Sequence, residues 1–215
     1  IEEGKDRVDI ADISPDVTLD PNDTSPEAQA RLAAGEPNIS GGYIWKVDRA
    51  DPGEPGFSAG GQGLNWVYPK SPNSNTAEPD QKASKLQEDW VKDYLGKFRT
   101  TLNNPDITDP EGYSKYIDPV SWVDNHLMNV LTMNVDALRL SAYLYKDRDD
   151  RVKYGPPWDF DRALESSDGR DDNPNVWRSE VPDFGTDFFG NGTQQWWGNL
   201  FQDKGFWQLY IDRWQ

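Results

Sequence analysis

The sequence predicts one α+β domain with an aromatic core and long ordered loops. Segments with the periodicities of strands and of helices alternate along the chain, without an internal repeat or a heptad pattern. The 215 residues suffice for one substantial core, and the 18 glycines and 16 prolines favour much irregular backbone. Within this single domain, 1–215, we expect residues 1–75 to be rich in strands, and residues 76–215 to be helical and to carry acidic motifs.

Strand-like sequence is concentrated in the first third of the chain. Residues 7–13, 41–48 and 64–69 are each predicted to form a short strand, and the Gly- and Pro-rich residues 51–63 a loop. Successive side chains point to opposite faces of a strand. The second strand therefore presents two sets of side chains, with Tyr43, Trp45 and Val47 on one face and Ile44 and Lys46 on the other.

The helices are predicted from their caps and their apolar spacing. Residues 25–34 predict a short helix, and residues 80–102 a long amphipathic helix. Residues 118–132 predict a third helix, with Asp118 as its N-cap and a proline at its first position. A last helix is expected to begin near Asp203.

The region between the last two helices combines strand-like and loop-like sequence. Residues 139–146 predict a strand, followed by an acidic turn over residues 147–150 and further strand-like sequence at residues 152–154. Beyond residue 165, Asp, Asn, Gly and Trp predominate, and we expect a long ordered loop.

The composition excludes several classes of function. A formal net charge of −16 disfavours phosphate backbones and anionic lipid, so we expect no nucleic-acid or membrane-surface partner. The absence of cysteine excludes disulfides and thiolate metal sites, and a single histidine, His126, excludes a multi-His zinc site. We interpret His126 as a packed side chain of its helix. No apolar run is long enough to span a membrane.

Two acidic clusters stand in strongly apolar, aromatic sequence. Asp136 follows the third helix, while Asp159 and Asp161 follow a Pro-Pro-Trp turn. A carboxylate in an apolar run is costly to bury unless it is paired, hydrogen-bonded or bound to a metal. If the Asp-Phe-Asp segment is extended, its two carboxylates point the same way, and such hard oxygen ligands suit Mg²⁺, Mn²⁺ or Ca²⁺.

Three interpretations of these carboxylates stay open on chemistry alone. In a phosphoryl-transfer site, one aspartate accepts the proton of the attacking hydroxyl and another holds the metal beside the nucleotide phosphates. In a structural site, the carboxylates bind Ca²⁺. In the third interpretation they only cap helices and turns, since aspartate is abundant in this chain. The acidic turn at residues 147–150 is assigned to solvent, or otherwise to a surface Ca²⁺ site.

A resemblance narrows this choice. Residues 134–147 and 155–162 resemble the paired acidic motifs of the CotH (spore coat protein H) kinase family, particularly its extracellular bacterial branch. Further segments resemble that family in the same order, at residues 4–10, 41–48, 116–124 and 196–214.

The resemblance implies a distant protein-kinase-like fold, mostly the larger helical lobe, that transfers phosphate from ATP to Ser or Thr hydroxyls of proteins. Matched by motif, Asp136 would be the catalytic-loop aspartate, and Asn134 would help to shape that loop. Asp159 would be the metal aspartate of the kinase Asp-Phe-Gly motif, and Asp161 an additional ligand of Mg²⁺ or Mn²⁺. The resemblance also implies an extracellular or cell-surface location in a bacterium.

The chain departs from the kinase pattern in two respects. Kinases usually carry an Asn five residues after the catalytic aspartate, and here that position is Ser141, a poorer metal ligand. A Gly-rich phosphate loop is not evident, because the glycines of residues 60–63 form a lone cluster. The resemblance then implies that the nucleotide-binding strands and their lysine lie upstream of Ile1. Residues 1–75 would be the remainder of that part, and the chain would be inactive without its missing N-terminal partner segment.

Three further residues are candidates for nucleotide binding, each with a structural alternative. Lys46 could reach a phosphate from its strand, although an exposed or salt-bridged lysine is our first interpretation. Arg139 could contact phosphate, although we first expect it to neutralise one of the carboxylates. Trp158 could stack on adenine or wall off the site, although packing in the core is our first interpretation.

Two other kinds of function stay open. The chain could be a non-catalytic extracellular module that keeps the fold and binds Ca²⁺ or a partner in its acidic pockets. It could also act on or bind carbohydrate, with two carboxylates as acid and base. The tryptophans of a sugar-stacking platform would then be Trp177, Trp196, Trp197, Trp207 and Trp214. Sequons for glycosylation occur at Asn22, Asn38 and Asn191.

Overall fold

A five-stranded sheet forms the centre of the described structure, in the strand order β2-β3-β1-β4-β5 with antiparallel neighbours throughout. The computed structural model describes residues 25–35, 38–164, 171, 173, 175, 188–190 and 196–215, without the side chain of Leu32. The strands are β1 (Tyr43–Val47), β2 (Phe57–Ala59), β3 (Gln62–Tyr68), β4 (Ala142–Lys146) and β5 (Lys153–Tyr154). The strand predicted at residues 7–13, and most of the loop predicted beyond residue 165, lie outside the described residues.

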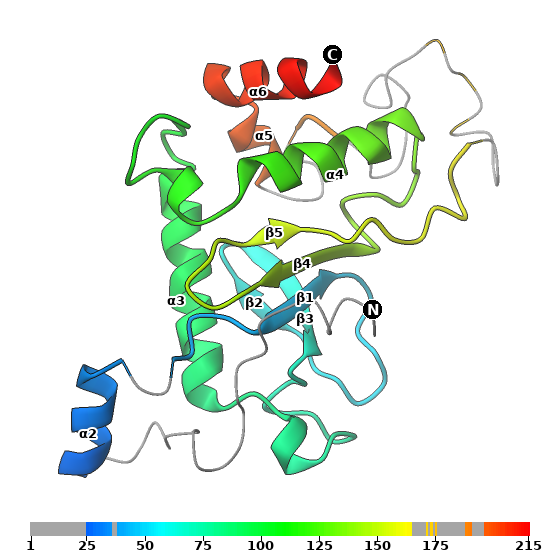
Figure 1. Cartoon of the computed structure of the whole chain (residues 1–215). Helices are drawn as coiled ribbons and strands as arrows, with labels where there is room; N and C mark the ends of the chain where they lie inside the picture. The colour runs from blue at the N-terminus through cyan, green and yellow to red at the C-terminus, as the bar shows by residue number, and fades with distance from the viewer. Residues whose placement is uncertain are drawn as a thin grey trace.

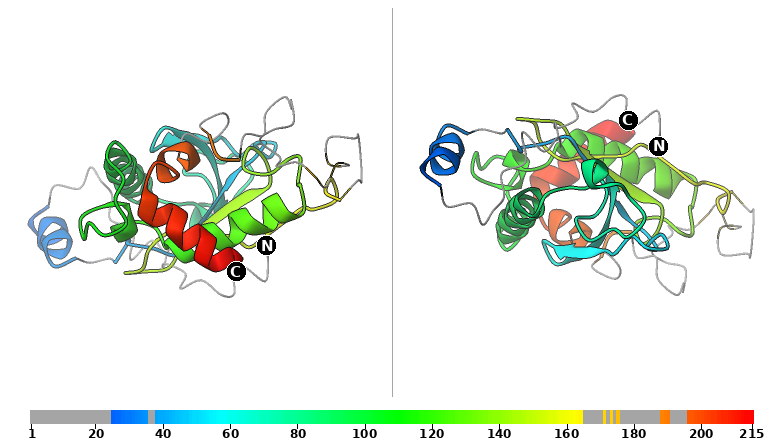
Figure 2. Two further views of the ribbon diagram at one scale, coloured as in Figure 1. Left: turned by 90° about the horizontal axis from the view of Figure 1, so that it is seen from above. Right: turned by 90° about the horizontal axis from the view of Figure 1, so that it is seen from below.

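Helices cover the sheet mainly from one side. They are α2 (Pro26–Ala33), α3 (Lys85–Thr101), α4 (Pro119–Leu131), α5 (Trp197–Leu200) and α6 (Lys204–Trp214), with short 3-10 turns at Pro79–Gln81 and Tyr113–Lys115. Helix α4 contacts both β5 and α6, and α3 contacts β2 (Figure 1). Seen from above, α6 lies over α4, while α2 stands at the periphery (Figure 2). None of the helices in the described ranges is long and apolar enough to cross a membrane.

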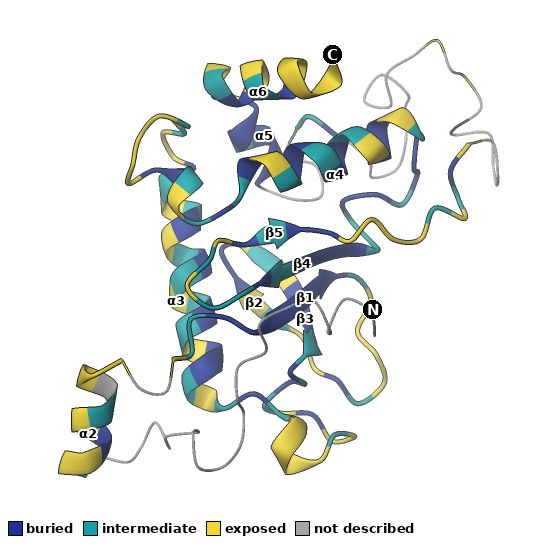
Figure 3. Cartoon of the chain, in the orientation of Figure 1, coloured by how far each residue is buried: buried dark blue, intermediate teal, exposed yellow. Residues whose placement is uncertain are grey.

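The two faces of β1 are used as its alternation predicts. All five residues of β1 are buried, as are most of β4 (Figure 3). Tyr43, Trp45 and Val47 join the main aromatic core under the helices. On the opposite face, Ile44 belongs to a smaller cluster with the Tyr143 ring of β4. The α+β class predicted from the sequence is confirmed.

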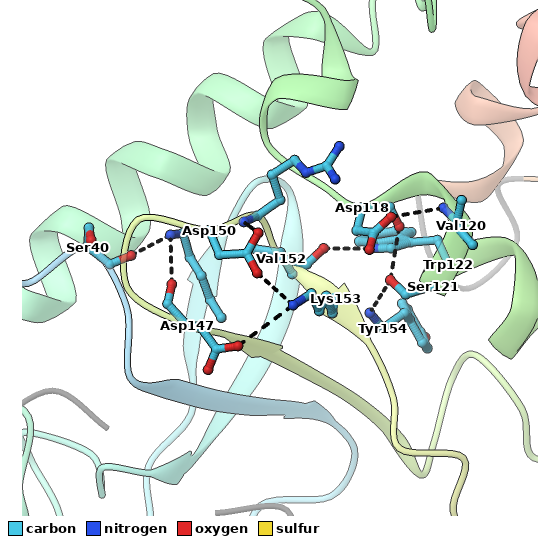
Figure 4. Close-up of polar contacts among 12 residues, drawn as sticks. Ser40, Asp118, Val120, Ser121, Trp122, Asp147, Asp150, Val152, Lys153 and Tyr154 are labelled. Atoms are coloured by element: carbon cyan, nitrogen blue, oxygen red, sulfur yellow. Dashed lines mark hydrogen bonds and ion pairs between the residues drawn. The ribbon is translucent and has the colours of Figure 1, made fainter. Parts of the chain in front are cut away.

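The N-terminal half of α4 is fixed to β5 by polar contacts (Figure 4). The backbone N–H of Asp118, the N-cap of α4, donates to the carbonyl of Val152 at 2.9 Å. The indole N–H of Trp122 donates to the same oxygen at 3.1 Å, and the N–H of Tyr154 donates to the Ser121 hydroxyl at 3.2 Å. These contacts confirm the predicted start of α4 and set its position over the sheet.

Three predicted boundaries differ from the structure. Residues 51–63 are not wholly a loop, because β2 and the start of β3 form a hairpin there, with its turn at Gly60 and Gly61 (φ 58° and 78°). The long helix begins at Lys85 and not at residue 80, because the Ser84 side chain caps it. The predicted strand over residues 139–146 begins only at Ala142, because Leu138 and Ser141 take positive φ angles.

His126 lies in the aromatic core between α4 and α6, as a packed histidine should. It is fully buried, one ring nitrogen lies 3.1 Å from the Tyr210 hydroxyl, and the other lies 2.8 Å from the Phe188 carbonyl oxygen. Burial lowers the pKa of His126 from 6.5 to about 4. The ring is therefore neutral in the folded protein at pH 7.

This burial predicts a loss of stability in mild acid. The unfolded chain protonates His126 near pH 6.5 and the folded chain only near pH 4, so the stability is complete above pH 6.5 and is lost as the pH falls through that window. Between pH 7 and pH 5, we expect the free energy of unfolding to fall by about 2 kcal/mol more in the wild type than in a His126→Leu variant. Chemical denaturation at both pH values measures the difference.

The control for this prediction is Tyr210→Phe. It removes the hydroxyl beside the imidazole but keeps the titrating ring, so it should retain the wild-type pH dependence. An equal dependence on pH in the wild type and in His126→Leu would contradict the assignment.

Candidate functional site

Two loops that carry the acidic motifs meet at one end of the sheet. We call residues 132–141, between α4 and β4, the first loop, and residues 155–164, after β5, the second loop. Because β4 and β5 are antiparallel partners, the end of the first loop and the start of the second lie side by side, and the N–H of Gly155 donates to the carbonyl of Tyr143 at 2.8 Å. Both loops lie on the right in Figure 1.

Asp136 lies in the first loop, where two arginines contact its carboxylate. Arg139, three residues on, donates to one oxygen at 2.8 Å, and Arg162 of the second loop approaches the other at 3.4 Å. The side chain of Asp136 is only 17% exposed, so this double pairing offsets much of the cost of its partial burial. Arg139 thus neutralises a carboxylate, which was the first interpretation of this residue.

Asn134 joins the main chains of the two loops. Its side-chain oxygen accepts the backbone N–H of Asp136 at 3.2 Å, and its amide nitrogen lies 3.5 Å from the carbonyl oxygen of Asp159. The Asn134 side chain is almost fully buried. A single amide group therefore sets how close the backbone at residue 136 lies to the backbone at residue 159.

The two carboxylates of the second loop are brought together by a turn. Asp159 has a φ angle of 63°, and residues 161 and 162 form a turn, so the extended Asp-Phe-Asp segment predicted from the sequence is wrong. Asp159 and Asp161 nevertheless contact each other through their side chains. Desolvation and then the negative charge of Asp159 raise the pKa of Asp161 above its ordinary value, and Asp136 adds to this shift.

Ser141, five residues after Asp136, contacts the second loop. Its hydroxyl donates to the Asp159 carboxylate at 2.9 Å. Asp136 and Arg162 both act electrostatically on Asp161. The structure therefore brings together all three aspartates proposed from the sequence, with Ser141 beside them.

Unusual backbone angles are concentrated in these loops. Within the described ranges six non-glycine residues have positive φ angles, and five of them belong to the two loops: Met133, Leu138, Ser141, Asp159 and Leu164. Such conformations cost on the order of 1–3 kcal/mol each and persist only where the surroundings enforce them. The loops are therefore held in a defined shape at an energetic cost, which is typical of functional sites.

The residues proposed for nucleotide contact lie on the sheet face next to the second loop. Lys46 is 8% exposed and forms an ion pair with Asp51 at 3.1 Å, which agrees with the salt-bridged alternative. Lys46 is opposite Tyr143 in the pairing of β1 with β4. Burial, and then the charges of nearby aspartates including Asp51 and Asp159, raise the pKa of Tyr143 to about 12. Lys46 thus lies in the neighbourhood of the acidic loops.

Trp158 does not pack in the core. Its side chain is 46% exposed, and its ring meets the edge of Tyr143 with 6.2 Å between the ring centroids. The first interpretation of Trp158 as a core residue is therefore wrong. The physical reason is that Trp158 belongs to the segment after β5, in which residues 156–159 are all exposed.

The donor atoms fit a divalent cation that also binds phosphate. Among the described residues, no group of three or more His, Cys, Asp or Glu side chains is arranged to hold a metal by itself. Mg²⁺, however, commonly binds through one or two carboxylates and takes its other ligands from water and substrate phosphates. The paired carboxylates of Asp159 and Asp161, with the Ser141 hydroxyl, provide hard oxygens of that kind.

The remaining acidic and aromatic candidates have structural partners. In the acidic turn, Asp147 and Asp150 pair with Lys153, and Asp149 accepts hydrogen bonds from Asn38 and Ser40. Of the tryptophans proposed as a sugar platform, Trp196 and Trp197 are fully buried in the core, while Trp177 lies outside the described residues. The buried pair cannot stack on a sugar, so these two tryptophans are wrong as members of the platform, whereas Trp207 and Trp214 are 37% and 48% exposed.

Two contributors to the site were missed in the sequence. Arg162 stands in the quoted motif, but no pattern indicated that it would reach Asp136 from the other loop. Asn129 of α4 donates and accepts hydrogen bonds at the base of the first loop. Asn129 could be identified from the sequence, because it is a polar amide on an apolar helix face, four residues after Asn125, and such a group needs a buried partner.

Comparison with known families accounts for this arrangement. The sequence model of the family described as CotH kinase protein matches residues 29–215, which include both acidic loops. Neither a curated protein nor a solved structure matches the chain. With most of its length matched, this chain belongs to the CotH kinase family.

Proposed function

We propose that this protein transfers the γ-phosphoryl group of ATP to Ser or Thr hydroxyls of proteins, with Mg²⁺ or Mn²⁺. The observation that carries the proposal is the meeting of Asp136, Asp159 and Asp161 across two loops joined by Asn134. Membership of the CotH kinase family supports it, and a kinase-like fold is part of the proposal.

Asp136 is the proposed proton acceptor. It stands apart from the Asp159–Asp161 pair, in the other loop, and its carboxylate is held by Arg139 and Arg162. An acceptor hydroxyl that approaches between the loops would give its proton to this carboxylate as its oxygen attacks the γ-phosphorus of ATP. The bond from that phosphorus to the oxygen bridging it to the β-phosphate would break, and ADP would leave. The two arginines orient the carboxylate and balance part of the negative charge that phosphate would bring.

Asp159 and Asp161 are the proposed metal ligands, with Ser141 beside them. Divalent metal, when bound, would neutralise charge on the phosphates. Desolvation, and then the negative charge of Asp159, raise the pKa of Asp161 above its ordinary value. The Ser141 hydroxyl orients Asp159 by donating to one of its oxygens.

The nucleotide is proposed to lie across the sheet face between Lys46 and Trp158. Trp158 offers an exposed ring on which adenine could stack, next to Asp159. Lys46 is paired with Tyr143 of β4, and Asp159 acts electrostatically on that tyrosine. In the proposal, the ammonium group of Lys46 exchanges its Asp51 partner for a phosphate oxygen. In this proposal Arg139 does not bind phosphate directly but holds the Asp136 carboxylate in place beside it.

An extracellular, non-catalytic module that binds Ca²⁺ is the second candidate. The observation that favours it is the exposure of Asp159 and Asp161, since exposed carboxylates also suit a cation of flexible coordination. In both candidates the protein acts outside the cell or at its surface. The two differ in their response to ATP.

Metal-dependent ATP binding tests the proposal. Titration calorimetry should show ATP binding with Mn²⁺ and none with EDTA. Asp159→Asn should weaken Mn²⁺–ATP binding by more than about 100-fold, because even an outer-sphere partner of a metal site is worth roughly 10–100-fold. The control Asp93→Asn breaks a surface ion pair with Lys97 on α3 and should bind as the wild type does.

The same titration separates the two candidates. Stabilisation by Ca²⁺ alone, with no heat on addition of ATP in any metal, would refute phosphoryl transfer and favour the structural module. The measurement uses the full-length protein, so that any nucleotide-binding segment upstream of Ile1 is present together with every proposed ligand.

Asp136→Asn should separate catalysis from binding. The substitution keeps the shape of the side chain but removes the proton acceptor, so kcat should fall by about 10²–10⁴-fold. Mn²⁺–ATP binding should remain within about threefold, since Asp136 is not a proposed metal ligand. Autophosphorylation followed by mass spectrometry measures the rate, and an unchanged rate would rule out Asp136 as the base.

A further inference from the structure

Three buried asparagines form a continuous hydrogen-bonded chain from α4 into the first loop. We call Asn125, Asn129 and Asn134 the amide relay. The amide nitrogen of Asn129 donates to the main-chain and side-chain oxygens of Asn125, at 2.9 and 3.0 Å. The side-chain oxygen of Asn129 accepts from the amide nitrogen of Asn134 at 3.0 Å.

The relay is buried along its whole length. Asn125, Asn129 and Asn134 are 6%, 7% and 2% exposed. An amide in such a place costs about 1–3 kcal/mol for each donor or acceptor left without a partner, so these hydrogen bonds are strongly favoured in the folded state. Buried polar networks of this kind fix one arrangement of the groups that they connect.

The relay has a direction, because Asn129 and Asn134 each accept and donate, while Asn125 accepts at its end. The N–H of Asp136 donates to the oxygen of Asn134, whose nitrogen donates to Asn129, whose nitrogen in turn donates to Asn125. Rotating any one amide by 180° would place two donors or two acceptors against each other. The position of the Asp136 backbone is therefore set from inside α4.

The relay also reaches the second loop. The amide nitrogen of Asn134 approaches the carbonyl oxygen of Asp159, at 3.5 Å. At the other end of the relay, a Cβ atom on Gly155 would lie 3.9 Å from the amide nitrogen of Asn125. The three amides therefore stand beside both the start of the second loop and its metal-site residue.

We propose that Asn129, with Asn125, is a positioning residue that sets the spacing between the Asp136 and Asp159 carboxylates through Asn134. Neither residue touches the reacting groups. Since the role is defined by the reaction, this inference rests on the proposed phosphoryl transfer. The geometric part, that α4 fixes the Asp136 backbone through amides, can be measured separately.

A pair of leucine variants tests the relay. Asn129→Leu keeps the branched shape of the side chain and raises the helix propensity of the position, but it removes both relay contacts. Asn125→Leu removes only one of the two acceptors of Asn129, since the main-chain oxygen remains, so it should have a smaller effect in the same direction. This milder variant serves if Asn129→Leu does not fold.

The matched control is Tyr210→Phe. It removes the buried hydrogen bond to His126, which belongs to the same helix but is not part of the relay. The control therefore reports what loosening of α4 does when the relay is intact. Thermal unfolding of all variants provides the stability scale for this comparison.

Two readouts are expected to change together. Hydrogen exchange of the Asp136 amide, measured by NMR without nucleotide, should speed up in Asn129→Leu and stay at the wild-type rate in Tyr210→Phe. The kcat for autophosphorylation should fall by about 10²-fold in Asn129→Leu, the scale expected for a displacement of reacting groups by about 1 Å. The KM for Mn²⁺–ATP should change by less than about threefold.

The outcomes distinguish the two proposals. A full-length wild-type protein without phosphoryl transfer would overturn the proposed function, while the exchange rate of the Asp136 amide would still decide whether the relay fixes the loop. Unchanged exchange of that amide in both leucine variants would overturn the relay. It would also be overturned if kcat fell equally in Tyr210→Phe and Asn129→Leu at equal loss of thermal stability, because the role would then be stability alone.

Discussion

The pairing of β4 with β5 beneath α4 is the constraint on which the rest of the site depends. The antiparallel pair places the end of the first loop next to the start of the second, and α4 is fixed above β5 by Asp118, Ser121 and Trp122. The two loops meet because the elements at their ends, α4 and β4 for the first loop and β5 for the second, are fixed by these contacts. The carboxylates of Asp136 and Asp161 are then near enough to act on each other.

The site concentrates negative charge in a protein that already carries a net charge of −16. Arg139 and Arg162 offset part of this charge at Asp136. At Asp161, desolvation and then the negative charge of Asp159 raise the pKa of the carboxyl group. Asp159 and Asp161, whose negative charge is less balanced, suit the proposed binding of a cation and its phosphates. Asp136, which is paired with two arginines, suits the proposed role of proton acceptor.

Much of the fold followed from local patterns. Ser25 and Asp118 marked the starts of α2 and α4, alternation assigned the two faces of β1, and Asp203 marked the start of α6. The errors have local causes too. The hairpin at Gly60 is not evident in the sequence because β2 has only three residues, and α3 begins after Ser84 and not at Asp80 because Pro79–Gln81 form a separate 3-10 turn.

By itself, the sequence determined the α+β class, the paired acidic motifs and, through them, the family, because these depend on residue types and short spacings. Only the tertiary structure decided how the motifs meet. The contacts of Arg162 with Asp136 and of Asn134 with Asp159 join positions about 25 residues apart, and no local periodicity encodes such contacts. The left-handed turn at Asp159 and the exposure of Trp158 likewise depend on how the second loop leaves the sheet, which is a property of the packed chain.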